Sequence, residues 1–433
     1  MSVELLAIRF DHDPASARAD ALTIRRNATS GVPSPEWQRG LSVLAQDSPA
    51  AYSINDTRRS GLTLQARFRC TDPRIGSAEI RAVAPPTPAP PPGLVEALLG
   101  PWSAYPQLVQ IYRDALRSLG TSGRASAVLG EVAPRRIDFG ADGLSGFEVF
   151  ELRNAGLWSA GVGVHDIRWQ WQARLASATP WSPIAETTHR VYVLLNTPTA
   201  PWQARASQAL ASQLPWTDVL DHACTWAAGA RDADTAAAAI TRAVYAHGSL
   251  LLRYDCVDVD GFGIDFLGSP HYTWLDPFDV FECTLFLERL RGGFGAGPYV
   301  NCTDCAAIVS TFANALGCNL WQSRMGYSFA LNPLLAIGAS AWERACGNFG
   351  SFFMHEVAWK GDCLADDAVF DACVALDASG HPAWPPHLPF VPADLRFGLT
   401  EQGLYRDLLA APVASGRPLC NPQPLSRRRR WVR

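Results

Sequence analysis

Apolar and polar residues alternate with a period near two in several segments of the first 200 residues. Residues 62–68, 147–152 and 167–172 place an apolar side chain at about every second position, which is the pattern of a strand with one buried face. Residues 189–195 form a more continuous apolar run. These segments predict a β-rich N-terminal part made of one or two sandwich-like units.

Beyond residue 200 the apolar residues recur at helical spacing instead. This spacing predicts helices at residues 217–228, 232–247, 277–290 and 303–316. Asp232 is a candidate N-cap for the second helix, Pro277 suits the first turn of the third, and Gly317 ends the last. The C-terminal half is therefore expected to be an α+β domain.

A proline-rich stretch at residues 84–93 is the clearest boundary in the chain. Such a run favours a stiff polyproline II linker that joins neither a sheet nor a helix. We therefore expect a β-rich module at residues 1–83 and a second, mostly β module at 94–200 that contains one helix at 106–119. The α+β domain would occupy residues 201–433.

Composition and charge narrow the classes of partner. The 433 residues are 48% hydrophobic and 18% charged, with a formal net charge of −4. The chain can therefore bury a large core, and it lacks the excess positive charge of a general nucleic-acid or anionic-membrane binder. Four consecutive arginines, at positions 427–430, stand near the C-terminus, where we expect a frayed and solvated basic tail.

The hydrophobic residues are also too dispersed for a membrane protein with helical spans. No apolar run approaches the roughly 18 residues needed to cross a bilayer. The first residues show no basic segment followed by an apolar one. We expect no membrane span and a cytoplasmic location, with which a specialised export route is also compatible.

Eleven cysteines, an odd number in a chain of this size, do not suit a disulfide framework. Cys302 and Cys305 form a Cys-x-x-Cys pair, but the strand-and-helix context of a redox pair near the chain start is missing. Residues 355–359 have tryptophan where a zinc protease needs its second histidine. The candidates for a second pair of zinc ligands lack a convincing spacing: they are His222 with Cys224, and Cys363 with Cys373. We expect no metal and no cofactor.

Cys302 stands immediately before the helix predicted at 303–316. The unpaired amides and the macrodipole of a helix N-terminus favour a thiolate over a thiol, and a thiolate is the competent nucleophile. The same amides can bind an oxyanion. Asn301 and Tyr299 are the candidate side-chain donors beside them.

His355 and Asp371 are the candidate partners of this cysteine. Each lies in or next to a strand-like segment, and two neighbouring strands can bring a histidine and an aspartate together. The aspartate would then fix the imidazole tautomer, and Cys302 would complete a triad. Asp377 is a rival third member.

These residues resemble a known family. Residues 302–306, with Leu316-Gly317 closing the helix, resemble the Cys-x-Asp-x-Ala…Leu-Gly core of the transglutaminase-like superfamily. His355 and Asp371, sixteen residues apart, are similar to its second and third blocks. The resemblance covers about residues 215–380 and implies a papain-like transglutaminase-core domain.

The resemblance implies a role for each site residue. Cys302 would be the nucleophile, His355 the general base and acid, and Asp371 the residue that orients the histidine, while Cys305 would be a core residue. The sequence departs from the family where Val357 replaces an aromatic residue and Ala372 replaces a proline.

The expected reaction is acyl transfer from an amide or peptide bond of a protein or peptide substrate. Hydrolysis, as by a protease, peptidase or amidase, is favoured over transglutaminase-type transfer to an amine, because members of the superfamily share a triad but differ in acceptor. The alternative is an inactive binding protein that keeps the fold, with partners recognised by the N-terminal modules. Tryptophans there could build such a surface: they are Trp102, Trp158, Trp169, Trp171, Trp181 and Trp202.

Overall fold

The computed structural model describes most of the chain and divides it into two compact units. The described residues are 2–12, 20–41, 44–57, 61–85, 128–202, 214–255, 270–274, 279–339, 342, 351–379, 388–398 and 404–433. The first unit comprises residues 1–22, 32–160 and 164–193, and the second comprises 23–31, 161–163 and 194–433. Most of the proline-rich stretch and the helix expected at 106–119 lie outside the described residues.

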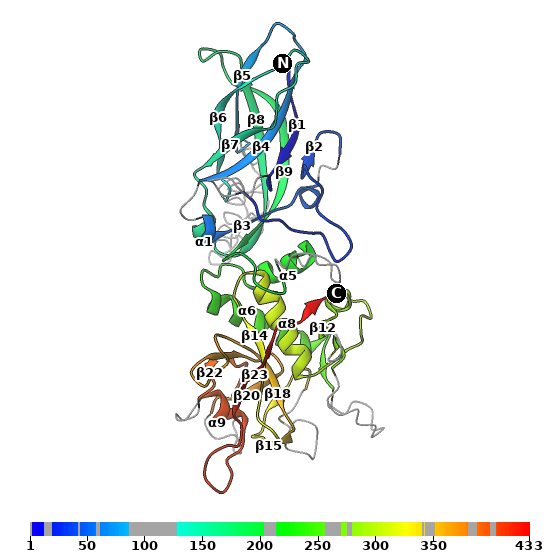
Figure 1. Cartoon of the computed structure of the whole chain (residues 1–433), viewed down its shortest axis with the longest axis vertical. Coiled ribbons are helices and arrows are strands. Elements are labelled where there is room, and N and C mark those ends of the chain that lie inside the picture. Colours follow the sequence, from blue (N-terminus) through cyan, green and yellow to red (C-terminus); the bar gives the residue numbers. More distant parts are fainter. Residues whose placement is uncertain are drawn as a thin grey trace, which may run out of the picture. The chain divides into compact units, whose positions relative to one another are not determined.

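The first unit is built on one curled sheet of nine strands, in the order β2-β1-β4-β7-β6-β5-β8-β9-β3 (Figure 1). The strands are β1 (Val3–Arg9), β2 (Trp37–Gln38), β3 (Ala50–Ser53), β4 (Leu62–Cys70), β5 (Ser77–Val83), β6 (Glu131–Asp138), β7 (Glu148–Arg153), β8 (Gly163–Arg174) and β9 (Ser182–Leu194). Two short helices accompany them, α1 (Ile54–Thr57) and α4 (Leu157–Ala160).

This sheet corrects the expected division into two N-terminal modules. Strand β4 pairs with β7, and β5 pairs with both β6 and β8, so strands from either side of the proline-rich stretch share one hydrogen-bonded ladder. The apolar side chains of these strands then pack together: the rings of Phe68 and Phe150 each lie within 6.0 Å of the Trp171 ring. A linker in sequence is therefore not a boundary in the fold.

The second unit has five helices among its described residues: α5 (Thr217–Trp226), α6 (Ala233–Ala246), α7 (Cys283–Leu290), α8 (Cys302–Ala315) and α9 (Tyr405–Leu409). Its largest sheet has the order β22-β19-β18-β14-β23. Those strands are β14 (Trp321–Met325), β18 (His355–Trp359), β19 (Ala368–Phe370), β22 (Ala393–Arg396) and β23 (Pro422–Arg428).

Shorter strands complete the unit in small sheets. They are β10 (Arg253–Tyr254), β11 (Thr273–Trp274), β12 (Val280–Phe281), β13 (Tyr299–Val300), β15 (Phe329–Ala330), β16 (Leu335–Ala336), β17 (Ser351–Phe352), β20 (Val374–Asp377), β21 (Pro389–Phe390) and β24 (Trp431–Val432). The chain is thus a strand-rich α+β protein, as the sequence predicted at this coarse level.

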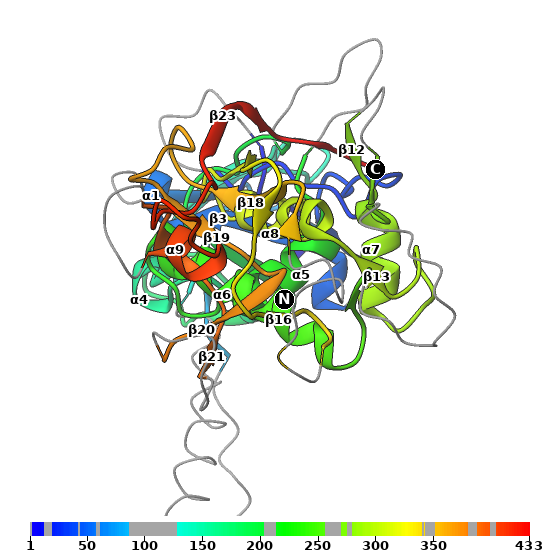
Figure 2. The same cartoon turned by 90° about the horizontal axis from the view of Figure 1, so that it is seen from below.

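Helix α8 is the central element of the second unit. All of its residues are buried, because its sequence is apolar or small on every face. It packs against the sheet through β18 and β14 and against α5 and α6 (Figures 1 and 2). Its first turn is thereby fixed relative to β18.

The helix predicted at 277–290 begins later than expected. Val280 and Phe281 form β12, which pairs with β11, and α7 starts only at Cys283. Asp279, before this strand, has a φ of 45°. Pairing with β11 and with β24 at the other end of the sequence therefore overrides the local helical pattern. The predicted start at Pro277 lies outside the described residues.

The expectation of a frayed basic tail is wrong. Strand β23 pairs with β14, and β24 pairs in parallel with β12. The side chain of Arg430 is fully buried and paired with carboxylates. The chain end is ordered because its backbone completes two sheets and its charge finds partners inside the protein.

The tryptophans of the expected recognition surface are partly core residues. Trp169, Trp171 and Trp202 are at most 1% exposed. Among the described members of the set only Trp158 is exposed, at 42%. Trp181 is half-buried beneath the guanidinium groups of two arginines, and Trp102 lies outside the described residues.

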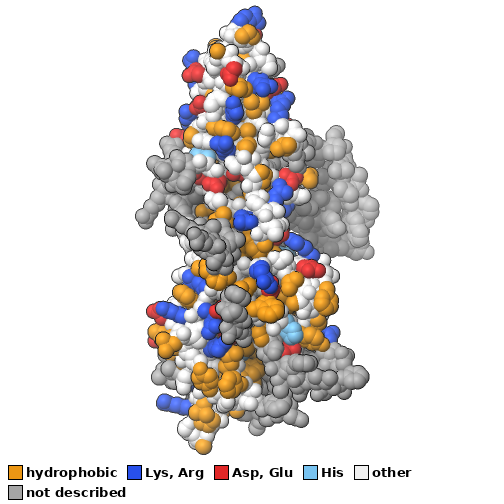
Figure 3. All heavy atoms as spheres, turned by 45° about the vertical axis from the view of Figure 1, so that its right-hand side comes forward, with side chains coloured by type: hydrophobic (Ala, Val, Ile, Leu, Met, Phe, Trp, Pro, Cys, Tyr) orange, Lys and Arg blue, Asp and Glu red, His pale blue; other side chains and the backbone are white. Residues whose placement is uncertain are grey.

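On the face drawn in Figure 3, basic and acidic side chains are interspersed and neither sign gathers into one patch. Within the described residues no helix is long and apolar enough to cross a membrane.

Candidate active site

The start of α8 is fixed by a capping box. The side chain of Asn301 accepts a hydrogen bond from the backbone N–H of Asp304 at 3.0 Å, and the Asp304 carboxylate accepts one from the N–H of Asn301 at 3.2 Å. These bonds satisfy amides that a helix start leaves unpaired. Cys302, the first residue of the helix, is therefore held in a defined backbone position.

Asp304 also anchors a second segment to this helix start. Its carboxylate accepts backbone hydrogen bonds from His271 at 2.8 Å and Tyr272 at 2.9 Å. Burial raises the pKa of Asp304 to about 6, although these hydrogen bonds oppose the rise. Asp304, two residues after Cys302, therefore has a structural role. Its carboxylate joins the first turn of α8 to residues 271–272, which lead into β11.

His355 and Asp371 are in direct contact. Nε2 of His355 lies 2.9 Å from Oδ2 of Asp371, and the two side chains are 0% and 1% exposed. His355 begins β18 and Asp371 directly follows β19, which pairs antiparallel with β18. The structure therefore brings this pair together through neighbouring strands.

Asp371 is held by two further donors. Its Oδ1 accepts from the backbone N–H of Cys373 at 2.8 Å, and its Oδ2 accepts from the hydroxyl of Tyr405 at 2.8 Å. Tyr405 is fully buried at the start of α9. These bonds fix the carboxylate that in turn fixes the imidazole.

The surroundings of His355 favour its charged form. Burial alone would lower the pKa of the imidazole, but the charge and hydrogen bond of Asp371 and the neighbouring Cys302 outweigh burial and raise it to about 10. Nδ1 of His355 is buried and makes no hydrogen bond to a nitrogen or oxygen atom within the described part of the chain, while the Cys302 thiol is a hydrogen-bonding neighbour of the imidazole. Since Nε2 is bonded to Asp371, Nδ1 is the ring nitrogen left for proton exchange.

An aromatic ring fixes the plane of this imidazole. Phe352, in β17, stacks on His355 with ring centroids 4.9 Å apart and an angle of 9° between the planes. The ring is itself buried and packs against Phe329 and Tyr254. His355 is therefore held by a carboxylate along one edge and by a ring on one face.

Cys302 lies at the same place in the unit. It interacts electrostatically with both His355 and the buried Tyr254, and its side chain is buried, with the residue 6% exposed. The three predicted residues of the triad, Cys302, His355 and Asp371, thus come from α8, β18 and the end of β19.

The remaining candidates have other surroundings. Asp377 accepts backbone hydrogen bonds from Ser379 and Leu388, whereas the carboxylate bonded to His355 is that of Asp371. Tyr299 is half-buried in β13, with its ring 5.8 Å from that of His271. The side-chain oxygen of Asn301 is used in the capping box.

The cysteines near the site are buried thiols. Cys305 is 1% exposed and Cys373 is fully buried, and burial raises the pKa of Cys373. Among the described residues no cluster of histidine, cysteine or acidic side chains has the arrangement of a metal site.

Two contacts to the site had no signal in the sequence. Tyr405 is 34 residues from Asp371 and in no recognisable motif. Phe352 lies close to His355 in sequence, but an aromatic residue in an apolar run gives no sign that it stacks on a histidine. A third residue, Glu356, belongs in sequence only to the failed zinc motif at residues 355–359, and its partners Thr303 and Arg430 lie 53 and 74 residues away.

Comparison with known proteins shows distant likeness at the level of structure. No family model and no curated protein matches the sequence. Among the solved structures that match, red sea bream transglutaminase is similar at 11% sequence identity with a TM-score of 0.33. The match covers 77% of this chain and 50% of the transglutaminase, so the chain spans about half the length of that protein. This is a distant structural resemblance, and we base the proposed function on the geometry of the site.

Proposed function

We propose that this protein is a cysteine-dependent acyl transferase or hydrolase with Cys302 as nucleophile, His355 as general base and acid, and Asp371 as the orienting carboxylate, in a papain-like arrangement. The observation that carries the proposal is the buried His355–Asp371 hydrogen bond of 2.9 Å, with the imidazole interacting with Cys302, the first residue of α8. A helix start, an imidazole and a carboxylate in this order favour an activated thiolate.

The proposed reaction has two steps. Sγ of Cys302 attacks the carbonyl carbon of an amide, and the C–N bond breaks as His355 donates a proton to the leaving amine, which leaves an acyl thioester. In the second step His355 takes a proton from water as its oxygen attacks the thioester carbonyl, and the C–S bond breaks to release the acid and the thiolate. The amides of the first turn of α8 are the proposed donors to the oxyanion.

The substrate class we propose is a protein or peptide, with water favoured as the acyl acceptor. Transfer to an amine would use the same thioester, because an amine in place of water completes the second step. Which acceptor dominates depends on how well the site excludes water.

A binding protein without activity is the second candidate. The observation that favours it is the enclosure of the site: Cys302 is 6% exposed, His355 0% and Asp371 1%. An enclosed triad can serve as a stable core in a fold whose function is recognition.

The deciding experiment is the pH dependence of Cys302 alkylation by iodoacetamide, mapped by peptide mass spectrometry. We expect alkylation of Cys302 well below the free-thiol pKa of about 8.5, faster than at the other cysteines. The low-pH reaction should be lost in His355→Ala and weakened in Asp371→Asn. If Cys302 in the wild type reacts only at the pH of an ordinary thiol, the acyl-transfer proposal is wrong and the binding role is favoured.

A further inference from the structure

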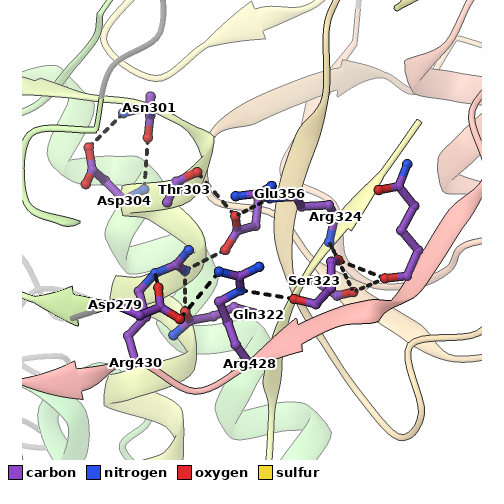
Figure 4. Close-up of polar contacts among 12 residues, drawn as sticks. Asp279, Asn301, Thr303, Asp304, Gln322, Ser323, Arg324, Glu356, Arg428 and Arg430 are labelled. Atoms are coloured by element: carbon purple, nitrogen blue, oxygen red, sulfur yellow. Dashed lines mark hydrogen bonds and ion pairs between the residues drawn. The ribbon is translucent and has the colours of Figure 1, made fainter. Parts of the chain in front are cut away.

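A network of charged residues, centred on the buried Arg430 and Glu356, lies behind the first turn of α8 (Figure 4). Arg430, fully buried, contacts Glu356 with Nη1 2.5 Å from Oε1, and its Nε lies 2.8 Å from Oδ1 of Asp279. Nη1 also donates to the amide oxygen of Gln322. Arg430, between β23 and β24, is thus a fully buried arginine in the interior of the second unit.

This network reaches both elements that carry the proposed Cys–His pair, α8 and β18. Glu356 directly follows His355 in β18, and its Oε2 accepts a hydrogen bond from the Thr303 hydroxyl at 3.3 Å. Thr303 directly follows Cys302 in α8 and is fully buried. The Glu356 carboxylate therefore joins β18 to α8 at the positions that directly follow His355 and Cys302.

The carboxylate has enough partners to remain charged. Burial would raise the pKa of Glu356, but Arg430 and Arg324 outweigh burial and lower it. Nε of Arg324, which is half-buried, lies 3.4 Å from Oε2. An ionised and multiply bonded carboxylate resists displacement more than a neutral side chain does, because moving it would leave buried charges unpaired.

The segment that supplies Arg430 is anchored on both sides of it. Strand β23 precedes Arg430 and pairs with β14, which in turn pairs with β18. Strand β24 follows it and pairs with β12, and Asp279 stands directly before β12. The position of the guanidinium is therefore set by two sheets as well as by its ion pairs.

From these contacts we infer that Arg430, Glu356 and Thr303 are positioning residues that hold the first turn of α8 against β18, and so hold Cys302 against His355. The inference rests on the proposed function. None of the three is placed to touch substrate in this scheme, and their effect passes through the two elements they join.

The test compares variants that weaken this link with a matched control. Arg430→Gln removes the charge, and Thr303→Val removes the hydroxyl but keeps the side-chain shape, whereas Thr303→Ser keeps the hydroxyl. Arg427→Gln is the control, because Arg427 lies in the same segment and makes its ion pair with the exposed Asp362. The readouts are the rate of Cys302 alkylation at low pH, the melting temperature, and amide hydrogen exchange in peptides covering α8 and β18.

We expect a graded loss of low-pH alkylation. Arg430→Gln should slow it roughly ten- to a hundredfold and Thr303→Val several-fold, since small misplacements of catalytic groups have effects of this size. Thr303→Ser and Arg427→Gln should stay close to wild type. Exchange of the first amides of α8 should rise in Arg430→Gln and Thr303→Val.

The outcomes separate this inference from the proposed function. A folded Thr303→Val with wild-type alkylation and exchange overturns the inference even if Arg430→Gln does not fold. An equal loss of alkylation in Thr303→Ser also overturns the inference. That variant keeps the hydroxyl, so the loss would not depend on the hydrogen bond from residue 303 to Glu356. If wild-type Cys302 lacks low-pH reactivity, the proposed function fails, and hydrogen exchange then decides whether the link itself exists.

Discussion

Asp371 is the residue on which the geometry of the candidate site depends most. It accepts hydrogen bonds from an imidazole, a tyrosine hydroxyl and a backbone amide at 2.8–2.9 Å. A carboxylate with two oxygens and three donors has little freedom to turn. His355 consequently has one preferred orientation, which the stacked ring of Phe352 also favours.

Tyr405→Phe tests the contribution of the hydroxyl to this arrangement. The change keeps the buried ring and removes one donor from Asp371, so we expect a loss of about 2 kcal/mol in the free energy of unfolding, the usual size for a hydrogen bond to a charged group. Urea denaturation measures the loss. A variant as stable as wild type would mean that the Tyr405 hydroxyl does not stabilise the carboxylate.

The raised pKa of His355 predicts a pH dependence of stability. The folded pKa of about 10 lies above the ordinary value of 6.5, so the folded state binds more protons between these values. Its stabilising contribution is complete below pH 6.5 and is lost as the pH rises through about 10. We expect the unfolding free energy of wild type to fall over this window relative to His355→Gln. Parallel curves for the two proteins would contradict the raised pKa.

Helix α8 shows how a local signal and a tertiary environment combine. Its apolar spacing and the position of Cys302 at its start could be predicted from the sequence, because both depend on residues within one or two turns. The C-terminal strands could not be predicted, since four arginines in a row indicate solvent unless their partners inside the protein, the buried Glu356 and the half-buried Asp279, are known.

The same distinction holds for the site. A histidine and an aspartate in adjacent strand-like segments predicted a contact, and β18 and β19 are indeed neighbours in the sheet. Tyr405 comes from a helix after several further segments, so only the tertiary fold reveals its bond to Asp371. The nine-stranded sheet was out of reach for a similar reason: strand order depends on pairings between distant residues.

Two N-caps allow the role of the α8 start to be tested against a control. Asn301→Ala and Asp232→Ala each remove a side chain that accepts a hydrogen bond from the third residue of its helix. Each should cost about 1 kcal/mol in unfolding free energy. Only Asn301→Ala should also slow low-pH alkylation of Cys302, because α6 does not carry the nucleophile. Equal alkylation rates in both variants would separate the helix cap from thiol reactivity.

The two compact units are not consecutive stretches of the sequence, because each is made of three separate segments. All candidate catalytic residues lie after Leu194, but the second unit also includes residues 23–31 and 161–163. The backbone N–H of Arg25 donates to the carbonyl of Pro215 at 2.8 Å, and that of Val162 donates to Ala230 at 2.8 Å. Short segments from the first half of the sequence are thus structural parts of the second unit.

A fragment of residues 194–433 should therefore be unstable on its own. It lacks residues 23–31, which bond to the backbone just before α5, and residues 161–163, which bond to the backbone just after it. We therefore expect a broad or absent thermal transition by circular dichroism, compared with a cooperative one in the full chain. A fragment that unfolds cooperatively near the temperature of the full chain would show that residues 23–31 and 161–163 are dispensable.

The interleaving of the two units also bears on how such a protein can evolve. A single recombination point cannot exchange either unit for another domain, because any cut before residue 194 divides the segments of at least one unit. The two units would be inherited together and would diversify by point substitution in place. Their sequences should therefore share one evolutionary history across species, whereas domains joined by a simple linker can each have their own.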